Sequence, residues 1–316
     1  MARLKAVLVL FAIVGFGVLT LAGALQAVDR LAGSKDRVVI GSKAFTESII
    51  ISEIIAEWLE AHEVPVERHF NLGATNISFQ AIKSGAVDLY SEYTGTGLYA
   101  ILHNAPIADR SQVLPTVRER FDVEHGILWL DPLGFNNTYA LAMPESLARR
   151  LGITKISDLL VHTDLRAGFA SEFLAREDGW PGLSAKYGLK FQKDPGSMEA
   201  GLMYQAASSG QVDVVSAYST DGRIDTQHLL VLEDDREFFP PYEPVIMVRR
   251  DTLKKRPNLE PLLRALRGAI SDGEMRKMNA EVDFGSRSTA DVAASFLAKH
   301  GPELTARLGD ADAAAR

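Results

Sequence analysis

Residues 72–99 read LGATNISFQAIKSGAVDLYSEYTGTGLY, and this stretch decides the fold. Its first part places apolar residues at helical spacing and ends at Gly85, a typical helix stop. Residues 86–90 then predict a buried strand, and the polar, glycine-rich residues 92–97 predict the turn after it. Since ligands of open α/β sheets bind at the carboxyl ends of strands, this turn is a candidate site. The alternative is an ordinary loop with a packed tyrosine.

A second stretch, residues 198–222, repeats this organisation. A helix ends at Gly210, a Val-Asp strand ends at Tyr218, and a turn rich in Ser, Thr and Gly follows. The strand-helix alternation that opens at residue 38 favours a parallel sheet. Two similar α/β lobes with a cleft between them are therefore expected.

The order of the predicted elements divides the chain between these lobes. Residues 131–139 break the pattern before a short apolar strand, and the rigid segment 238–244 leads to the strand that returns the chain. We expect a discontinuous first lobe from residues 37–136 and 244–310, and a second lobe from residues 137–243.

Three further elements are predicted inside the second lobe. Residues 165–170 predict a strand, residues 171–181 predict the loop at its end, and residues 189–191 predict another short strand.

Composition excludes several classes of function. The 316 residues are 47% hydrophobic and 24% charged, as in an ordinary globular protein. The net charge of -7 comes without any Lys/Arg-rich run, so no nucleic-acid partner is expected. The chain has no cysteine, no G-x-S-x-G or H-E-x-x-H motif, and scattered histidines. We therefore expect no enzyme, no metal site and no cofactor.

The amino terminus has the pattern of an export signal. Residues 1–5 carry two positive charges, residues 6–25 are apolar apart from Thr20, and residues 22–24 offer a small-x-small cleavage site. We expect residues 1–27 to be a cleaved signal peptide and the mature protein to be periplasmic. The apolar run also approaches the ~20 residues that span a bilayer, so an uncleaved membrane anchor is the alternative.

The turn before the first long predicted helix is a candidate anion site. Residues 42–47 feed that helix, its first backbone amides point toward the turn, and Lys43 adds a positive charge. The alternative is a surface lysine beside a helix.

Six motifs together resemble the glycine betaine/choline/carnitine substrate-binding proteins of osmoprotectant ABC transporters, in order and in spacing. They are GSKAFTES (41–48), LYSEYTGTGL (89–98), GFNNTYALAM (134–143), SEFLAREDGWPGL (171–183), AYSTDGRI (217–224) and EDDREFFPPY (233–242). The resemblance covers residues 38–297, nearly all of the mature chain.

This resemblance implies a type II periplasmic-binding-protein fold, in which two Rossmann-like lobes are joined by two crossing segments. Such a protein closes on a quaternary ammonium compound and delivers it to an ABC permease in the inner membrane, and we expect it to be a monomer. The matching positions imply an aromatic box and an anion clamp. The box is Tyr93 and Tyr242 from the first lobe with Tyr139 and Tyr218 from the second, and the clamp is Lys43, Thr96 and Arg176.

The chemistry of such a site is consistent with these residue types. A trimethylammonium group has no N–H to donate, but aromatic faces attract it through the ring quadrupole by roughly 0.5–2 kcal/mol per good contact. Lys43 and Arg176 would meet the carboxylate of a betaine, and Thr96 would add a neutral donor. The alternatives are core packing for each tyrosine and a solvated surface charge for each cation.

The sequence also departs from the common wording of that family. Ala44, Ala74 and Ser91 stand where Asn, Gly and Pro are frequent, and Ser91 precedes the pair Glu92-Tyr93. These changes leave the ligand open. Glycine betaine is the first expectation, with choline, carnitine or ergothioneine as other trimethylammonium ligands, and a membrane-anchored sensory binding module is a further alternative.

Overall fold

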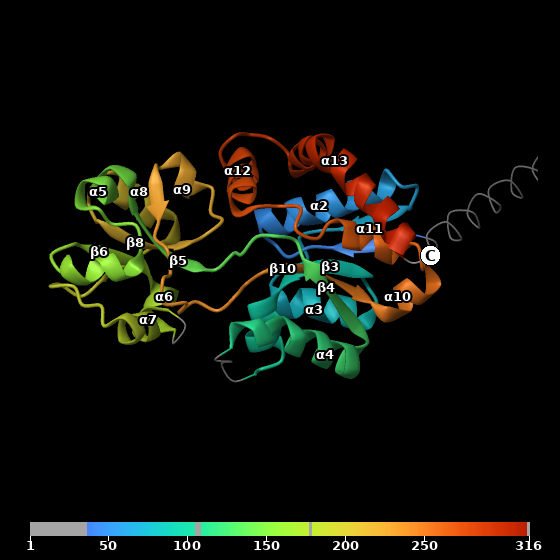
Figure 1. Ribbon diagram of the computed structural model, residues 1–316, viewed down its shortest axis with the longest axis horizontal. Helices are drawn as coiled ribbons and strands as arrows, with labels where there is room; N and C mark the ends of the chain where they lie inside the picture. Colours follow the sequence, from blue (N-terminus) through green and yellow to red (C-terminus); the bar gives the residue numbers. More distant parts are fainter. Residues whose placement is uncertain (1–36, 105–108, 177–178, 315–316) are drawn as a thin grey trace, which may run out of the picture.

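The computed structural model describes residues 37–104, 109–176 and 179–314, and within them the chain forms two α/β lobes (Figure 1). The predicted signal or anchor, residues 1–27, lies outside the described residues. None of the helices in the described ranges is both long enough and apolar enough to cross a membrane.

The first lobe is built on a sheet whose strand order is β2-β1-β3-β10-β4. Its strands are β1 (Val38–Gly41), β2 (Val66–His69), β3 (Leu89–Tyr93), β4 (Ile127–Pro132) and β10 (Pro244–Arg249). Strand β1 runs parallel to β2 and β3, whereas β10 is antiparallel to both of its neighbours. The late strand β10 therefore completes a sheet that the amino-terminal third of the chain began.

The second lobe repeats this topology. Its strands are β5 (Tyr139–Pro144), β6 (Ala167–Ala170), β7 (Gly196–Met198), β8 (Val214–Tyr218) and β9 (Leu229–Val231). They lie in the order β7-β6-β8-β5-β9, with β6 parallel to β7 and β8 and with β5 antiparallel to β8 and β9. In each lobe the antiparallel strand is the one that the chain enters after crossing from the other lobe. The predicted two-lobed fold of type II is thus confirmed.

Helices cover both faces of the first sheet. They are α2 (Thr46–Glu60), α3 (Thr75–Ser84), α4 (Val113–His125), α10 (Arg250–Lys255), α11 (Leu259–Ala265), α12 (Asp272–Asp283) and α13 (Thr289–Ala314). Figure 1 shows α2, α11 and α13 over one face and α3 and α4 over the other. The apolar run of α2 explains its place, because Ile50, Ile54 and Ile55 are buried between the sheet and α13.

The second sheet is covered in the same way by shorter helices. They are α5 (Glu145–Leu151), α6 (Ser171–Ala175), α7 (Trp180–Tyr187), α8 (Ala200–Ser208) and α9 (Arg223–Thr226). A short 3₁₀-helix also occurs in this lobe at η3 (Ile156–Val161), whereas the first lobe contains a π-helix at η1 (Thr96–Ile101) and a 3₁₀-helix at η2 (Arg110–Gln112). Phe169 and Phe173 pack edge to face in the core of this lobe, with ring centroids 5.3 Å apart.

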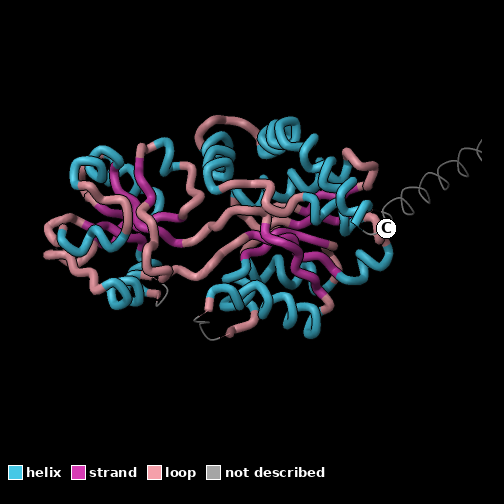
Figure 2. Tube along the Cα trace, in the orientation of Figure 1, coloured by secondary structure: helices cyan, strands magenta, loops and turns pink. Residues whose placement is uncertain are grey.

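Residues 133–138 and 232–243 connect the two sheets, and both segments cross between the lobes (Figure 2). They hydrogen-bond to each other: Asn137 N donates to the carbonyl of Tyr242 at 3.1 Å, and Tyr242 N donates to Asn136 Oδ1 at 2.7 Å. The two crossing segments, which together form the hinge between the lobes, are therefore hydrogen-bonded to each other and are not independent linkers.

Helix α12 makes a further contact between the lobes, and Figure 1 shows it standing between α9 and α2. Arg276 donates to the carbonyl of Ser219 in the second lobe at 3.0 Å. At Gly222 an added Cβ would lie 2.6 Å from the backbone nitrogen of Ala280, so glycine is required for this close approach. Helix α12 of the first lobe is thus in direct contact with residues 219–222 of the second lobe.

Strand β3 begins later than predicted. It covers Leu89–Tyr93 rather than residues 86–90, and Tyr93 pairs with Pro244 of β10 instead of lying in a turn. Asp88 explains the late start, because its carboxylate accepts hydrogen bonds from Val39 N at 2.8 Å and from Thr252 Oγ1 at 2.6 Å.

Two predictions in the second lobe are wrong. Residues 171–181 are not a loop throughout, since they contain α6 and the start of α7. Residues 189–191 form no strand, and the edge strand β7 comes later, at Gly196–Met198. The apolar character of this stretch serves packing instead, because the Phe191 ring stacks on Trp180 with centroids 5.6 Å apart.

The packing of α2 gives a test of the first lobe. Ile55 is fully buried, whereas Ile77 on α3 is 57% exposed. We expect Ile55→Ala to lower the free energy of unfolding by about 2–5 kcal/mol, because the deletion leaves a cavity that the core cannot fill. The matched variant Ile77→Ala should change it by no more than about 0.5 kcal/mol. Chemical denaturation followed by circular dichroism measures both, and equal effects would contradict this packing.

Candidate functional site

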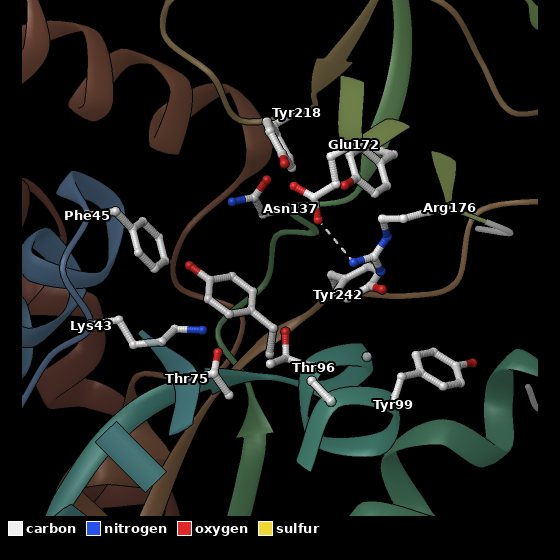
Figure 3. Close-up of a pocket in the computed structure, with 14 residues that line it drawn as sticks. Lys43, Phe45, Thr75, Thr96, Tyr99, Asn137, Glu172, Arg176, Tyr218 and Tyr242 are labelled. Atoms are coloured by element: carbon white, nitrogen blue, oxygen red, sulfur yellow. Dashed lines mark hydrogen bonds and ion pairs between the residues drawn. The ribbon is translucent and has the colours of Figure 1, made fainter. Parts of the chain in front are cut away.

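A cavity of about 310 Å³ lies between the lobes, and residues from both lobes line it (Figure 3). All seven residues of the predicted box and clamp lie on its wall: Lys43, Tyr93, Thr96, Tyr139, Arg176, Tyr218 and Tyr242. The volume is at the small end of the roughly 300–1,000 Å³ typical of ligand pockets. The structure therefore brings together residues that are widely separated in the sequence.

Three of the tyrosines stand at strand ends that face the other lobe. Tyr93 ends β3, Tyr218 ends the equivalent strand β8, and Tyr139 begins β5. Tyr139 and Tyr218 are directly opposite each other in the antiparallel ladder, so their rings stack with centroids 5.1 Å apart. Burial is the main cause that raises the pKa of Tyr139 well above its ordinary value, and a hydrogen bond with Tyr218 raises this pKa further. The phenol is therefore neutral at physiological pH.

Glycines position the fourth tyrosine and the threonine. A Cβ at Gly95 would lie 2.6 Å from the Tyr242 ring, and a Cβ at Gly97 would lie 2.3 Å from the Trp129 ring. Only glycine allows the backbone of this turn to approach both rings so closely. Thr96, at the start of η1, is thereby held at the cavity wall beside Tyr242.

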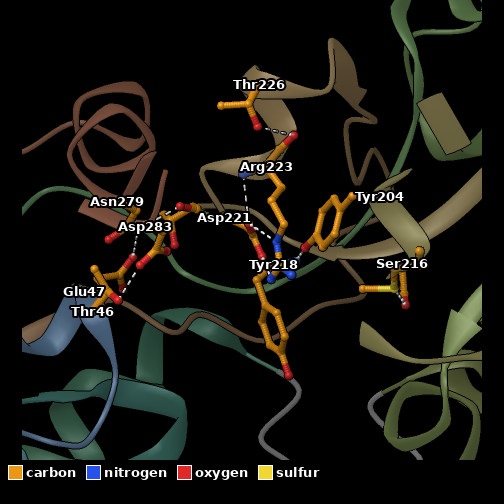
Figure 4. Close-up of polar contacts among 12 residues, drawn as sticks. Thr46, Glu47, Tyr204, Ser216, Tyr218, Asp221, Arg223, Thr226, Asn279 and Asp283 are labelled. Atoms are coloured by element: carbon orange, nitrogen blue, oxygen red, sulfur yellow. Dashed lines mark hydrogen bonds and ion pairs between the residues drawn. The ribbon is translucent and has the colours of Figure 1, made fainter. Parts of the chain in front are cut away.

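The hydroxyl of Tyr93 is fixed by a buried carboxylate. Tyr93 Oη donates to Glu47 Oε1 at 2.6 Å, and Glu47 also accepts from Asn137 Nδ2 at 2.9 Å and from Asn279 Nδ2 at 3.0 Å. Figure 4 shows Glu47 beside Asn279 of α12. Burial raises the pKa of Glu47, although hydrogen bonds from these neutral donors oppose the shift. The network ties the edge of the cavity to the crossing segment and to α12.

Lys43 is buried, so the alternative of a surface charge is wrong for this residue. Its exposed fraction is 6%, and its Nζ lies 2.5 Å from Oε1 of the fully buried Glu92. The same nitrogen lies over two aromatic faces, 4.7 Å from the ring centroid of Tyr93 and 5.4 Å from that of Phe45. The charge of Lys43 is thus already paired, and its cation already covers one ring of the predicted box.

Arg176 follows α6 at the cavity wall and is also paired with a carboxylate. Its Nη1 lies 3.1 Å from Oε1 of Glu172, one helical turn earlier, and the dashed line in Figure 3 marks this contact. Its Cζ lies 5.8 Å from the ring centroid of Tyr139. Both members of the pair line the cavity and remain partly exposed to solvent, with side-chain exposures of 43% for Arg176 and 62% for Glu172.

Hydrogen bonds and a cation–π contact in the second lobe support the end of β8, where Tyr218 lies (Figure 4). Tyr218 N donates to Tyr204 Oη at 3.3 Å, and the guanidinium of Arg223 lies 4.6 Å from the centroid of the Tyr204 ring. Arg223 in turn pairs with Asp221 at 2.6 Å. Beyond Tyr218 a smaller space of about 180 Å³ continues toward Asp221 and Asp283.

Sequence reasoning missed several residues of the wall: Phe45, Thr75, Tyr99, Asn137 and Glu172. Phe45, Asn137 and Glu172 lie within the quoted motifs at residues 41–48, 134–143 and 171–183. The i,i+4 spacing of Glu172 and Arg176 would have predicted their ion pair, had residues 171–175 been recognised as a helix. Among the residues that the structure describes, no three His, Cys, Asp or Glu side chains are grouped so as to hold a metal ion.

Comparison with known proteins agrees with this fold. A family model described as the substrate binding domain of ABC-type glycine betaine transport system matches residues 36–299. The carnitine transport binding protein OpuCC of Listeria monocytogenes is 38% identical over 272 residues, which cover 84% of this chain and 88% of that protein. A solved structure described as a glycine betaine/carnitine/choline ABC transporter is 34% identical, with a TM-score of 0.80 over 84% of this chain and 98% of that one.

A third relative has a different name and a greater length. The ergothioneine transport permease/ergothioneine binding protein EgtU of Helicobacter pylori is 34% identical over 285 residues, which cover 90% of this chain but only 51% of that protein. The family match spans most of the sequence, and the identity to relatives exceeds one third over most of its length. The chain belongs to the family of substrate-binding domains of ABC-type glycine betaine transport systems.

Proposed function

We propose that this protein is the periplasmic component of an ABC importer and captures glycine betaine or a related quaternary ammonium compound in the cavity between its lobes. Choline, carnitine and ergothioneine are the other trimethylammonium ligands of the proposal. The observation that carries it is the convergence of four tyrosines from both sheets and the crossing segment on one cavity. Aromatic faces attract a cation that cannot be hydrogen-bonded, and they exclude water from it.

The accessible rings indicate where the ammonium group would enter. Phe45 and Tyr218 are each 39% exposed, although aromatic side chains are usually well buried. Both line the cavity with Tyr242, and the three rings come from different elements of the fold. Tyr93 and Tyr139 also line the cavity but are only 4% and 9% exposed.

Closure of the lobes completes the proposed mechanism. The first lobe, residues 37–136 and 244–310, and the second, residues 137–243, would rotate about the paired crossing segments. A ligand that contacts both lobes favours the closed form, because only that form makes all of its contacts. Export by a cleaved signal in residues 1–27, a monomeric state and delivery to a permease in the inner membrane belong to the same proposal.

Isothermal titration calorimetry over glycine betaine, choline, carnitine, proline betaine and ergothioneine tests the proposal. At least one of these ligands should bind and be recovered unchanged. Binding of none of them, or their chemical conversion, would overturn it.

Tyr218 provides a test of the aromatic box. We expect Tyr218→Ala to weaken binding by roughly tenfold or more, since it removes one cation–π face and opens the cavity to water. Tyr218→Phe keeps the ring and should stay within about threefold of wild type, and this variant is the matched control. If the alanine variant binds as tightly as wild type in calorimetry, Tyr218 does not belong to the box.

Arg176 provides a test of the anion clamp. We expect Arg176→Ala to weaken glycine betaine binding by roughly tenfold, because the carboxylate loses a charged donor. Choline has no carboxylate, so its affinity should not fall. Equal losses for both ligands would indicate that Arg176 acts through the structure of the second lobe and not on the carboxylate.

A further inference from the structure

We propose that Glu172 is a specificity-determining residue, which by pairing with Arg176 makes the cavity favour net-cationic quaternary ammonium compounds over zwitterionic betaines. This inference rests on the proposed function and deepens it. Glu172 lines the cavity, although neither the composition nor the family resemblance singled it out.

The two cations of the predicted clamp, both on the cavity wall, are already paired with carboxylates. Lys43 and Arg176 are cations of the wall, and each has a carboxylate within ion-pair distance: Glu92 at 2.5 Å and Glu172 at 3.1 Å. A ligand carboxylate therefore meets cations that are already paired. The ammonium group of a ligand is attracted to the partly exposed rings of Phe45 and Tyr218 without displacing a carboxylate from a cation.

The two pairs differ in how easily a ligand can open them. Glu92 is fully buried and Lys43 is 6% exposed, so separating them would leave a buried charge without its partner. Glu172 and Arg176 are 62% and 43% exposed in their side chains, and water can replace either partner at little cost. Arg176 is thus the cation that a ligand carboxylate can recruit, and Glu172 is its competitor.

The position of Glu172 and the closure of the lobes make this competition select between cationic and zwitterionic ligands. Arg176 lies over Tyr139, whose ring stacks on Tyr218, so Glu172 is close to the ring faces where an ammonium group would bind. Closing the lobes removes water and strengthens each charge interaction. A ligand with net positive charge is then attracted to the carboxylate of Glu172. A betaine must instead displace Glu172 from Arg176, and its own carboxylate then lies beside the negative charge of Glu172.

The variant Glu172→Gln tests the inference, because it keeps the shape of the side chain and removes its charge. We expect calorimetry to show tighter binding of glycine betaine and weaker binding of choline than in wild type. The ratio of the two affinities should shift by roughly tenfold. One unit charge at about 6 Å changes an affinity by roughly threefold in water and by roughly a hundredfold in a partly desolvated site, so the expected shift lies within this range.

A matched control is available in the same lobe. Glu145 and Arg149 of α5 form an ion pair with the same spacing and the same distance, 3.1 Å, but neither residue lines the cavity. Glu145→Gln should leave both affinities and their ratio unchanged, and thermal unfolding should show that both variants fold.

The possible failures are distinguishable. If wild type binds choline or glycine betaine but Glu172→Gln leaves their affinity ratio unchanged, or shifts it equally with Glu145→Gln, this inference is overturned and the proposed function stands. A wild-type protein that binds no quaternary ammonium compound overturns the proposed function, and with it the inference.

Discussion

The carboxylate of Glu47 is the junction on which the shape of the cavity depends. It lies in the first turn of α2 and accepts hydrogen bonds from Tyr93, Asn137 and Asn279, which belong to β3, a crossing segment and α12. Asn279 also donates to the carbonyl of Thr220 in the second lobe at 2.9 Å. A buried carboxylate without a cation needs such donors, so loss of any one would cost more than an ordinary hydrogen bond. The first lobe, the hinge and the second lobe are therefore held around one group.

The protein's own cations already use part of the aromatic surface. Lys43 lies over Tyr93 and Arg176 lies over Tyr139, at 4.7 Å and 5.8 Å from the ring centroids. Tyr93 and Tyr139 are well buried, whereas Phe45 and Tyr218 on the same cavity wall are each 39% exposed. Each cation also brings a carboxylate to the site, Glu92 beside Lys43 and Glu172 beside Arg176. In our proposal, these carboxylates determine how the cavity responds to a ligand's charge.

Local patterns in the sequence predicted the repeated lobes, and the family resemblance predicted seven residues of the cavity wall. Neither predicted how those residues are buried and paired. The recurrence of helix, glycine, Val-Asp strand and tyrosine predicted that β3 and β8 are equivalent, and both end in a tyrosine at the cavity. Lys43 shows the limit, because its burial against Glu92 depends on two segments that pair only in the folded lobe. Residues 189–191 show a second limit, since Phe191 stacks on Trp180 of α7 and the segment does not join the sheet. Such tertiary contacts override local pattern.

The central claim is that ring faces from both lobes hold a cation by its charge and not only by its shape. Calorimetry with choline and with its neutral isostere 3,3-dimethylbutan-1-ol, in which carbon replaces the nitrogen, tests this most directly. Our account predicts that the isostere binds at least roughly tenfold more weakly than choline, because a neutral group loses the attraction of each ring quadrupole. Equal affinities of the two compounds would contradict it.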